Sequence, residues 1–337
     1  MNVRSNVRLI SSMSVLCLML APAHAADAKT TGKSDLSLEI GNRFWIGQMS
    51  YDYKLFDNKT GLMDSRLRWS DVNTLSNETT FRVTHQKSGV FLKGYAGLGA
   101  NFGGSLDDED YIYNYPTPDG PFTGKFLDTY SRGSRDTNFY GVVDLGIAVP
   151  LPQQWPLHLS GFVGGFAQKQ SLLSKGVRCN ADEANQIACQ APPGAVIVPF
   201  DQKSIGFETT MYGARAGLEA VLDISDQLTW RNEAAYVFAG NFKLEDSHYL
   251  RTKELGPTPN FVDDGNGLDG YQLETEISWA FTGSLSVNAG ARYWRLNSGK
   301  ADGVAGAQLP PDQRIRENYS RSKIDQYGVM VGLAYKF

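Results

Sequence analysis

Apolar and polar side chains alternate along residues 326–337, at the very end of the chain. One face of this segment is apolar with aromatic residues at its ends: Tyr327, Val329, Val331, Leu333, Tyr335 and Phe337. The other face is mostly small or polar: Gln326, Gly328, Met330, Gly332, Ala334 and Lys336. Successive residues of a β-strand point to opposite faces. Apolar-out, polar-in alternation of this kind is typical of the strands of a transmembrane β-barrel.

The same alternation recurs in residues 212–222, 271–281 and 285–294. In a soluble β-sandwich the apolar face would form the interior. Here the opposite face carries charged side chains: Arg215, Glu219, Glu274, Glu276 and Arg292. We therefore expect a narrow barrel interior that is crossed by structural ion pairs.

The predicted fold is all-β, a ten-stranded antiparallel transmembrane β-barrel with long extracellular loops. The strands are expected near residues 35–53, 63–84, 90–104, 137–149, 157–172, 205–223, 227–245, 269–282, 285–297 and 323–337. Four short connections, at 85–89, 150–156, 223–226 and 282–284, alternate with mostly longer ones. Short periplasmic turns and longer extracellular loops are usual in this class, and an even number of strands places both termini in the periplasm.

The N-terminal segment has the pattern of a secretory signal peptide. Arg4 and Arg8 precede a mostly apolar run over residues 9–21, and an Ala-x-Ala cleavage site follows at residues 23–25. No later apolar run reaches the roughly 18 residues of a transmembrane helix. We expect residues 1–25 to be removed on export and residues 26–337 to form one barrel domain in the bacterial outer membrane.

Charge and cysteine content limit the possible partners. The formal net charge of −4 becomes −6 once the two arginines of the signal are removed, which argues against a nucleic-acid partner. Of the three cysteines, only Cys179 and Cys189 fall in the expected mature chain. In an exported protein this spacing predicts a disulfide that closes a loop rather than a metal site.

The predicted strand positions show on which side of the membrane each of the four histidines is expected. His24 is lost with the signal, and His85 and His158 lie at predicted periplasmic turns. His248 lies at the extracellular end of the seventh strand, two residues after Asp246. Residues at this spacing on a strand share a face.

A second pair with the same spacing lies on the same side of the membrane. Asp108 and Asp110 follow the extracellular end of the third predicted strand. A histidine beside a carboxylate is the usual arrangement of a general base, and two close aspartates raise each other's pKa. If the two pairs face each other, they could hold a water molecule and direct it at a peptide carbonyl, without a covalent nucleophile or a metal.

Each pair also has an ordinary interpretation. The acidic run at residues 107–110 could be solvated, or it could hold divalent cations against the lipid surface. A single Asp-x-His is more often a surface pair than a catalytic one.

Several segments resemble the omptin family, outer-membrane proteases of Gram-negative bacteria with ten-stranded barrels. Residues 103–111 read Gly-Gly-Ser-Leu-Asp-Asp-Glu-Asp-Tyr, similar to the omptin segment in which two glycines precede Asp-x-Asp and an aromatic residue. Residues 246–249, Asp-Ser-His-Tyr, match the family's Asp-x-His-Tyr. Further similarity occurs at residues 65–69, 136–137, 205–207 and 332–337, so it extends over nearly all of the expected mature chain.

The resemblance implies roles for individual residues. Asp108 and Asp110 would be the aspartate pair, His248 the base and Asp246 its orienting partner. Ser131 and Asp128 resemble residues of the family's substrate cleft.

The resemblance also implies partners. Omptins cut beside basic residues of peptides or surface proteins and need bound lipopolysaccharide for activity. The terminal aromatic residues look like the signal that the barrel-assembly machinery recognises.

The chain departs from the family at the position two before the dyad aspartate. This position is acidic in basic-cutting members and is Leu244 here. For the acidic residue of the first hairpin, Asp52 is only a candidate.

The leading hypothesis is an outer-membrane endopeptidase of omptin type that acts at the extracellular mouth of its barrel. One alternative is a catalytically inactive surface-binding or adhesin barrel. The other is a small porin, which large inward side chains disfavour.

Overall fold

The computed structural model describes residues 35–118, 120–152, 154–180, 192, 194–313 and 318–337. The predicted signal peptide, residues 1–25, and the expected start of the mature chain near Ala26 lie outside the described residues. The described helices are α1 (Thr252–Leu255) and the 3-10 turn η2 (Pro311–Gln313). In this part of the chain, no helix has the length and apolar character needed to cross a membrane.

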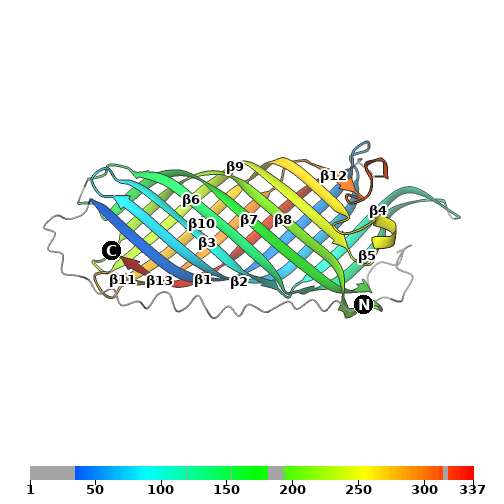
Figure 1. Cartoon of the computed structure of the whole chain (residues 1–337), viewed down its shortest axis with the longest axis horizontal. Coiled ribbons are helices and arrows are strands. Elements are labelled where there is room, and N and C mark those ends of the chain that lie inside the picture. Colours follow the sequence, from blue (N-terminus) through cyan, green and yellow to red (C-terminus); the bar gives the residue numbers. More distant parts are fainter. Residues whose placement is uncertain (1–34, 119, 153, 181–191, 193, 314–317) are drawn as a thin grey trace, which may run out of the picture. The chain divides into compact units, whose positions relative to one another are not determined.

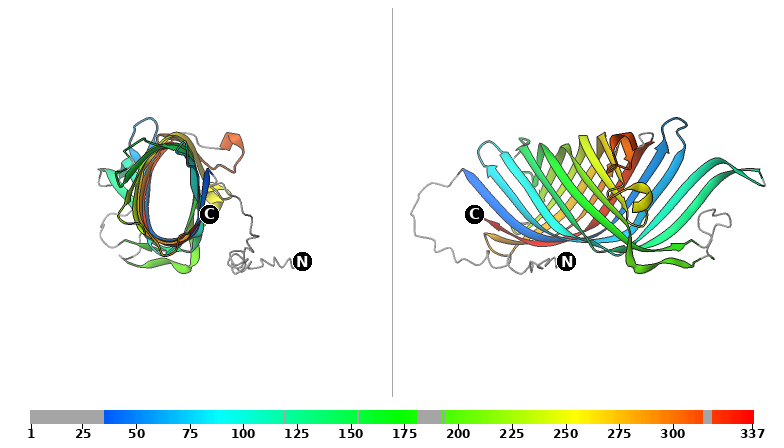
Figure 2. Two further views of the ribbon diagram at one scale, coloured as in Figure 1. Left: turned by 90° about the vertical axis from the view of Figure 1, so that its left-hand side faces the viewer. Right: turned by 45° about the vertical axis from the view of Figure 1, so that its right-hand side comes forward.

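Ten antiparallel strands form a closed ring, as predicted (Figure 1). In ring order they are β1 (Leu36–Asp57), β2 (Met63–His85), β3 (Val90–Phe102), β6 (Asp136–Ala148), β7 (Leu157–Cys179), β8 (Val196–Asp223), β9 (Leu228–His248), β10 (Phe261–Ala280), β11 (Leu285–Asn297) and β13 (Asn318–Lys336). The last strand pairs with the first from Glu39↔Lys336 to Asp57↔Asn318, which closes the ring (Figure 2).

The outer surface of the ring has the apolar character that the alternation predicts. Many large apolar side chains are exposed on it, among them Phe44, Ile46, Leu98, Phe139, Val143, Leu145, Ile147, Val163, Leu218, Val329, Val331 and Leu333. Their neighbours along each strand point inward, so the same strands provide both an apolar outer surface and a separate interior.

The two ends of the ring differ. The short connections from β2 to β3, β6 to β7, β8 to β9 and β10 to β11 lie at one end, which we call the short-turn end. The other end, the long-loop end, carries further strands that the sequence did not predict. Residues 105–134, expected as a loop, form the hairpin β4 (Ser105–Thr117) and β5 (Gly120–Ser134), and β12 (Ala301–Ala305) pairs with β10 and β13.

The β4–β5 hairpin continues the barrel wall beyond the ends of β3 and β6. β4 pairs with β2 from Ser65↔Asp110 to Ser70↔Ser105, and β5 pairs with β7. The break between β3 and β4 is made by Gly103 and Gly104, whose φ angles of 67° and 74° are readily adopted only by glycine. The acidic run at residues 107–110 therefore lies on a paired strand and not at the base of a loop.

The interior is filled in layers along β1. Inward-facing Arg43 lies in an ion-pair layer near the short-turn end, and Trp45 packs next to it with Tyr140 and Trp294. Farther toward the long-loop end, Tyr51 and its neighbours form an apolar layer whose buried members include Met49, Tyr53, Leu67, Trp69, Leu106, Phe207, Met211 and Leu244. This apolar layer is the floor beneath the long-loop end.

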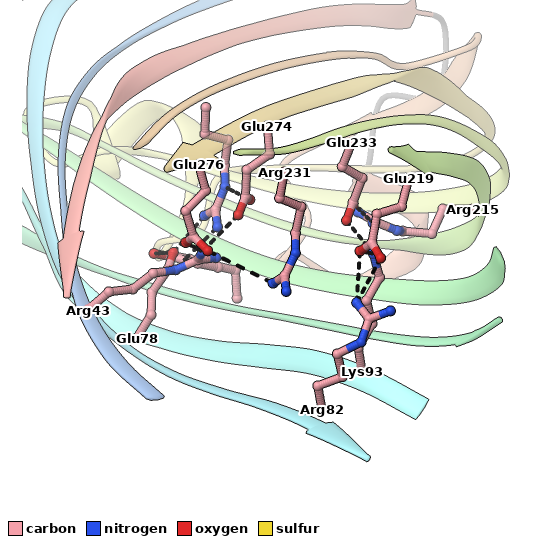
Figure 3. Close-up of polar contacts among 12 residues, drawn as sticks. Arg43, Glu78, Arg82, Lys93, Arg215, Glu219, Arg231, Glu233, Glu274 and Glu276 are labelled. Atoms are coloured by element: carbon pink, nitrogen blue, oxygen red, sulfur yellow. Dashed lines mark hydrogen bonds and ion pairs between the residues drawn. The ribbon is translucent and has the colours of Figure 1, made fainter. Parts of the chain in front are cut away.

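The predicted interior ion pairs are present and form two groups, in each of which neighbouring charges share partners (Figure 3). In the first group, Arg292 donates to Glu78 at 2.6 Å and Arg43 donates to Glu274 at 2.7 Å. The second group consists of Arg82, Lys93, Asp144, Arg215, Glu219 and Glu233. Each buried charge meets one or more opposite charges, as a water-poor interior requires.

Replacement of Glu78 by alanine should strongly destabilise the barrel. Glu78 is fully buried between Arg43 and Arg292, and its loss leaves both guanidinium groups without this partner. Removing one member of a buried ion pair typically costs about 3–5 kcal/mol. Denaturant unfolding in detergent micelles measures the loss. As a control, Asp35→Ala breaks the exposed Asp35–Lys87 pair and should change little. Equal losses in the two variants would contradict the role given to the interior network.

Candidate active site

The histidine and its aspartate lie together at the end of β9. His248 Nε2 is 3.0 Å from Asp246 Oδ2, as their shared face on the strand predicts. Asp246 is almost fully buried, and the ring of Phe261 packs edge-on against the imidazole at 5.3 Å. The imidazole is therefore held by a carboxylate on one side and an aromatic ring on another.

Asn260 fixes the backbone of the dyad. Its Oδ1 accepts a hydrogen bond from the His248 N–H at 2.6 Å, and its own N–H donates to the Asp246 carbonyl at 2.9 Å. Its amide Nδ2 donates to the Gly256 carbonyl at 2.7 Å, inside the loop between β9 and β10. No local motif in the sequence pointed to Asn260, because its partners lie on the neighbouring strand and within the loop.

Asp108 and Asp110 share the inward face of β4. Asp108 is paired in register with Leu67, a buried member of the apolar floor, and Asp110 is paired with Ser65. The Ser65 side chain hydrogen-bonds the Asp110 carboxylate. Both aspartates also interact electrostatically with His248 and with Asp246. The structure therefore brings the two predicted pairs to one site at the long-loop end.

The protonation of this site is strongly shifted. Burial, together with the charge of Asp110, raises the pKa of Asp108 to about 8. Burial also raises the pKa of Asp110. For His248, burial lowers the pKa, but the adjacent Asp246 carboxylate outweighs it and brings the pKa to about 9. Near neutral pH the site therefore retains protons on both the imidazole and the aspartate pair.

Arg251 is a cation beside the site that the sequence did not single out. It follows His248 by three residues, and its charge opposes protonation of His248, Asp108 and Asp110. Its guanidinium Nε donates to Glu254 at 3.1 Å, within the loop. A positive charge thus lies at the edge of the site.

The two predicted cleft residues on β5 have different positions. Ser131 is buried and shares the inward face with Leu106, its register partner, one step along β4 from Asp108. Asp128 is paired with Glu109 and therefore lies on the opposite face of the hairpin from the aspartate pair. There its Oδ2 accepts a hydrogen bond from Lys125 Nζ at 2.8 Å. The structure brings Ser131 close to the aspartate pair but not Asp128.

Two residues discussed for substrate preference are also placed. Leu244 is fully buried in the apolar floor, on the same face as Asp246. Asp52 is on the outward face of β1, where Arg66 Nε donates to it at 2.8 Å. Asp52 therefore does not supply the missing acidic group to the site.

The remaining candidates lie elsewhere. His158 pairs with Asp223 at 2.8 Å at the short-turn end, and His85 contacts Ser88 in a turn there. Cys179 ends β7 and is disulfide-bonded, while Cys189 lies outside the described residues. In the described part of the chain, no cluster of His, Cys, Asp or Glu side chains could hold a metal ion.

Comparison with known proteins gives a match in structure but not in sequence. No protein-family profile matches the chain, and no curated protein sequence matches it. The outer membrane protease OmpT from Escherichia coli has a similar structure, with a TM-score of 0.58 and 14% sequence identity. The match covers 89% of this chain and 97% of OmpT. The chain is therefore a ten-stranded β-barrel with an OmpT-like fold.

Two other barrels match with lower scores. The outer membrane protein OprG from Pseudomonas aeruginosa has a TM-score of 0.32 at 10% identity, covering 89% of this chain and 95% of OprG. The Ralstonia pickettii toluene transporter TbuX has a TM-score of 0.29 at 11% identity, covering 88% of this chain and 89% of TbuX.

The buried Asp108 carboxyl should reduce stability at neutral pH. In the unfolded chain it ionises near 3.8, whereas the folded site keeps its proton up to about pH 8. The folded state then binds more protons than the unfolded state in this window, so stability falls as pH rises through it. Asp108→Asn removes the effect and should raise the melting temperature at pH 8 by at least about 2 °C.

The comparison of Asp108→Asn with its parent should be repeated at pH 4, where the gain should shrink. Asp201→Asn, at an exposed position on β8, serves as the control and should not stabilise at either pH. Heat unfolding followed by circular dichroism in micelles measures both. A gain that is independent of pH would contradict the assigned protonation.

Proposed function

We propose that this protein is an outer-membrane endopeptidase of omptin type, which hydrolyses peptide bonds at the long-loop end of its barrel. The observation that carries the proposal is the His248–Asp246 dyad, which shares one buried site with the Asp108/Asp110 pair. The OmpT-like fold supports the proposal. In a barrel of this fold the site would lie on the strand ends that project from the outer side of the membrane.

The geometry supports a water-based mechanism. In molecules whose His248 is neutral, a water molecule held between the two pairs loses a proton to the imidazole as its oxygen attacks the peptide carbonyl carbon. Because the pKa of His248 is about 9, the fraction of such molecules grows as the pH rises toward that value. Asp246 stabilises the imidazolium that forms. The proton retained on the Asp108/Asp110 pair can be donated in a hydrogen bond to the carbonyl oxygen, where negative charge develops. His248 then gives its proton to the leaving amine as the C–N bond breaks.

The preference for basic substrates that the omptin resemblance implies has less support. The position two before the dyad aspartate is the apolar Leu244, and both Asp52 and Asp128 face away from the site. Arg251 adds a positive charge at its edge. Peptide or protein substrates at the cell surface remain the proposed class, with the preferred residues to be read from cleavage products.

A requirement for lipopolysaccharide is part of the same proposal. Arg132, Lys175 and Lys203 are paired in register across β5, β7 and β8. They lie on the side opposite the buried Ser174 and Ser204, so they form a basic row on the outer surface of the long-loop end. Such a row suits the phosphate groups of lipopolysaccharide. Recognition of the C-terminal strand by the barrel-assembly machinery is likewise proposed from the sequence resemblance.

A porin function has little support. The two interior ion-pair groups and the apolar floor occupy successive layers of the barrel. Large side chains in these layers leave little room for a continuous aqueous channel.

Substitution of His248 tests the proposal directly. His248→Ala should lower kcat/KM for peptide cleavage by about 10²–10⁴-fold, the usual contribution of a general base. The assay uses protein purified in detergent with lipopolysaccharide added, and mass spectrometry of a mixed peptide library.

His158→Ala is the matched control, because it also removes a histidine paired with an aspartate, but at the short-turn end. It should retain the parent activity. If His248→Ala cleaves as fast as the parent, the assigned base is wrong. If the parent cleaves nothing in the library, a surface-binding role on the same barrel becomes the better account.

A further inference from the structure

A fourth carboxyl, besides those of Asp108, Asp110 and Asp246, lies one step along the barrel wall from the dyad aspartate. Asp263 is on β10, where Phe261 is the register partner of Asp246 and Asp263 is the partner of Leu244. Asp263 and Asp246 therefore face the same interior on adjacent strands, displaced by one step. Diagonal neighbours of this kind have their backbones about 7–8 Å apart, which brings the side chains closer than that.

The surroundings of Asp263 are polar but contain no compensating cation. The carboxylate accepts a hydrogen bond from the Tyr53 hydroxyl at 2.7 Å, and only 1% of the residue is exposed. The other titratable or polar groups that act on it are Tyr51 on β1, Asp246 on β9, Asp264 on β10 and Ser320 on β13, and Tyr51 in turn hydrogen-bonds Thr209 on β8. Within the described residues, Asp263 makes no ion pair.

The Asp246 carboxylate interacts electrostatically with Asp263. Its Oδ2 is engaged by His248, whereas its buried Oδ1 accepts no hydrogen bond from the described residues. Burial raises the pKa of Asp263 to about 6, and the Asp246 charge contributes to this rise. Above that pH two carboxylates lie behind a single imidazole.

We propose that Asp263 is a positioning residue that sets the proton affinity of the His248–Asp246 dyad by placing a second negative charge behind Asp246. Its ionised form stabilises the His248 imidazolium and so increases the basicity of the imidazole. The charges that reach His248 from its other sides are Asp108, Asp110 and Arg251. The inference rests on the proposed function, in which His248 is the base, but it concerns an equilibrium that can be measured without substrate.

The test is Asp263→Asn, which keeps an oxygen that can accept the Tyr53 hydrogen bond and removes only the charge. Opposite charges on the order of 10 Å apart at a buried site interact strongly enough to move a pKa by about one unit. The pKa of His248 should therefore fall by about one unit, and the acid limb of kcat/KM should move to lower pH by the same amount.

Asp264→Asn is the matched control. It removes the same charge from the adjacent position, whose exposed side chain points to the other face of β10. It should leave the His248 titration unchanged.

The titration is read by NMR of the full mature chain in micelles, with ring-labelled histidine. Besides His248, only His85 and His158 are expected in the mature chain, and their signals serve as internal references.

The outcomes separate this inference from the proposed function. An unchanged His248 titration in folded Asp263→Asn would overturn the inference. So would a change confined to KM for cationic peptides, which would make Asp263 a substrate-binding group. A shifted titration in a protein that cleaves no peptide would support the inference while the proposed function fails.

Discussion

The backbone pairing between β13 and β1 is the constraint on which the other features depend. In a lipid environment every backbone donor and acceptor must be satisfied within the protein, and a sheet achieves this only by closing on itself. Closure from Glu39↔Lys336 to Asp57↔Asn318 fixes which side chains face inward around the whole ring. A narrow closed ring must then fill its interior, and here it does so with paired charges at one end and an apolar floor at the other.

The candidate site is a consequence of extending that wall. β2, β7, β8, β9 and β10 run past the apolar band, and the β4–β5 hairpin fills the gap left where β3 and β6 end. Because the extension keeps the alternation of the ring, Asp108 faces the same interior as Asp246, above the apolar floor. Burial by that floor, rather than any single partner, is the largest influence on the pKa of Asp108.

The sequence predicted the ten ring strands and the short turns, because lipid on one side and a packed interior on the other impose a period of two. It did not predict β4 and β5, since a hairpin whose outward face meets water shows no apolar stripe. The sequence also could not show that Asp128 points away from the site. The face on which Asp128 lies depends on the β4–β5 register and on the break in the strand at Gly103 and Gly104.

The close pairs of the site could be found by spacing, and the distant partners could not. Asp246 and His248 are two residues apart, as are Asp108 and Asp110, so strand geometry alone places each pair on one face. Asn260, Phe261 and Asp263 reach the dyad only through the register between β9 and β10, which depends on the whole ring. Joining the two pairs into one site likewise needed the fold.

The hydrogen bonds between Asn260 and the backbone of Asp246 and His248 also leave much of the loop of residues 249–260 open to substitution. The loop leaves the wall directly after His248 and returns at the residue that ties the dyad backbone in place. Apart from Arg251, whose charge acts on the site, and Gly256, which accepts a hydrogen bond from Asn260, most of its residues take no part in these contacts. The length and composition of the remainder can therefore change while the dyad stays anchored. Natural variation or engineering could therefore replace the rest of this loop and change which residues contact a substrate at the surface, while the dyad keeps its position.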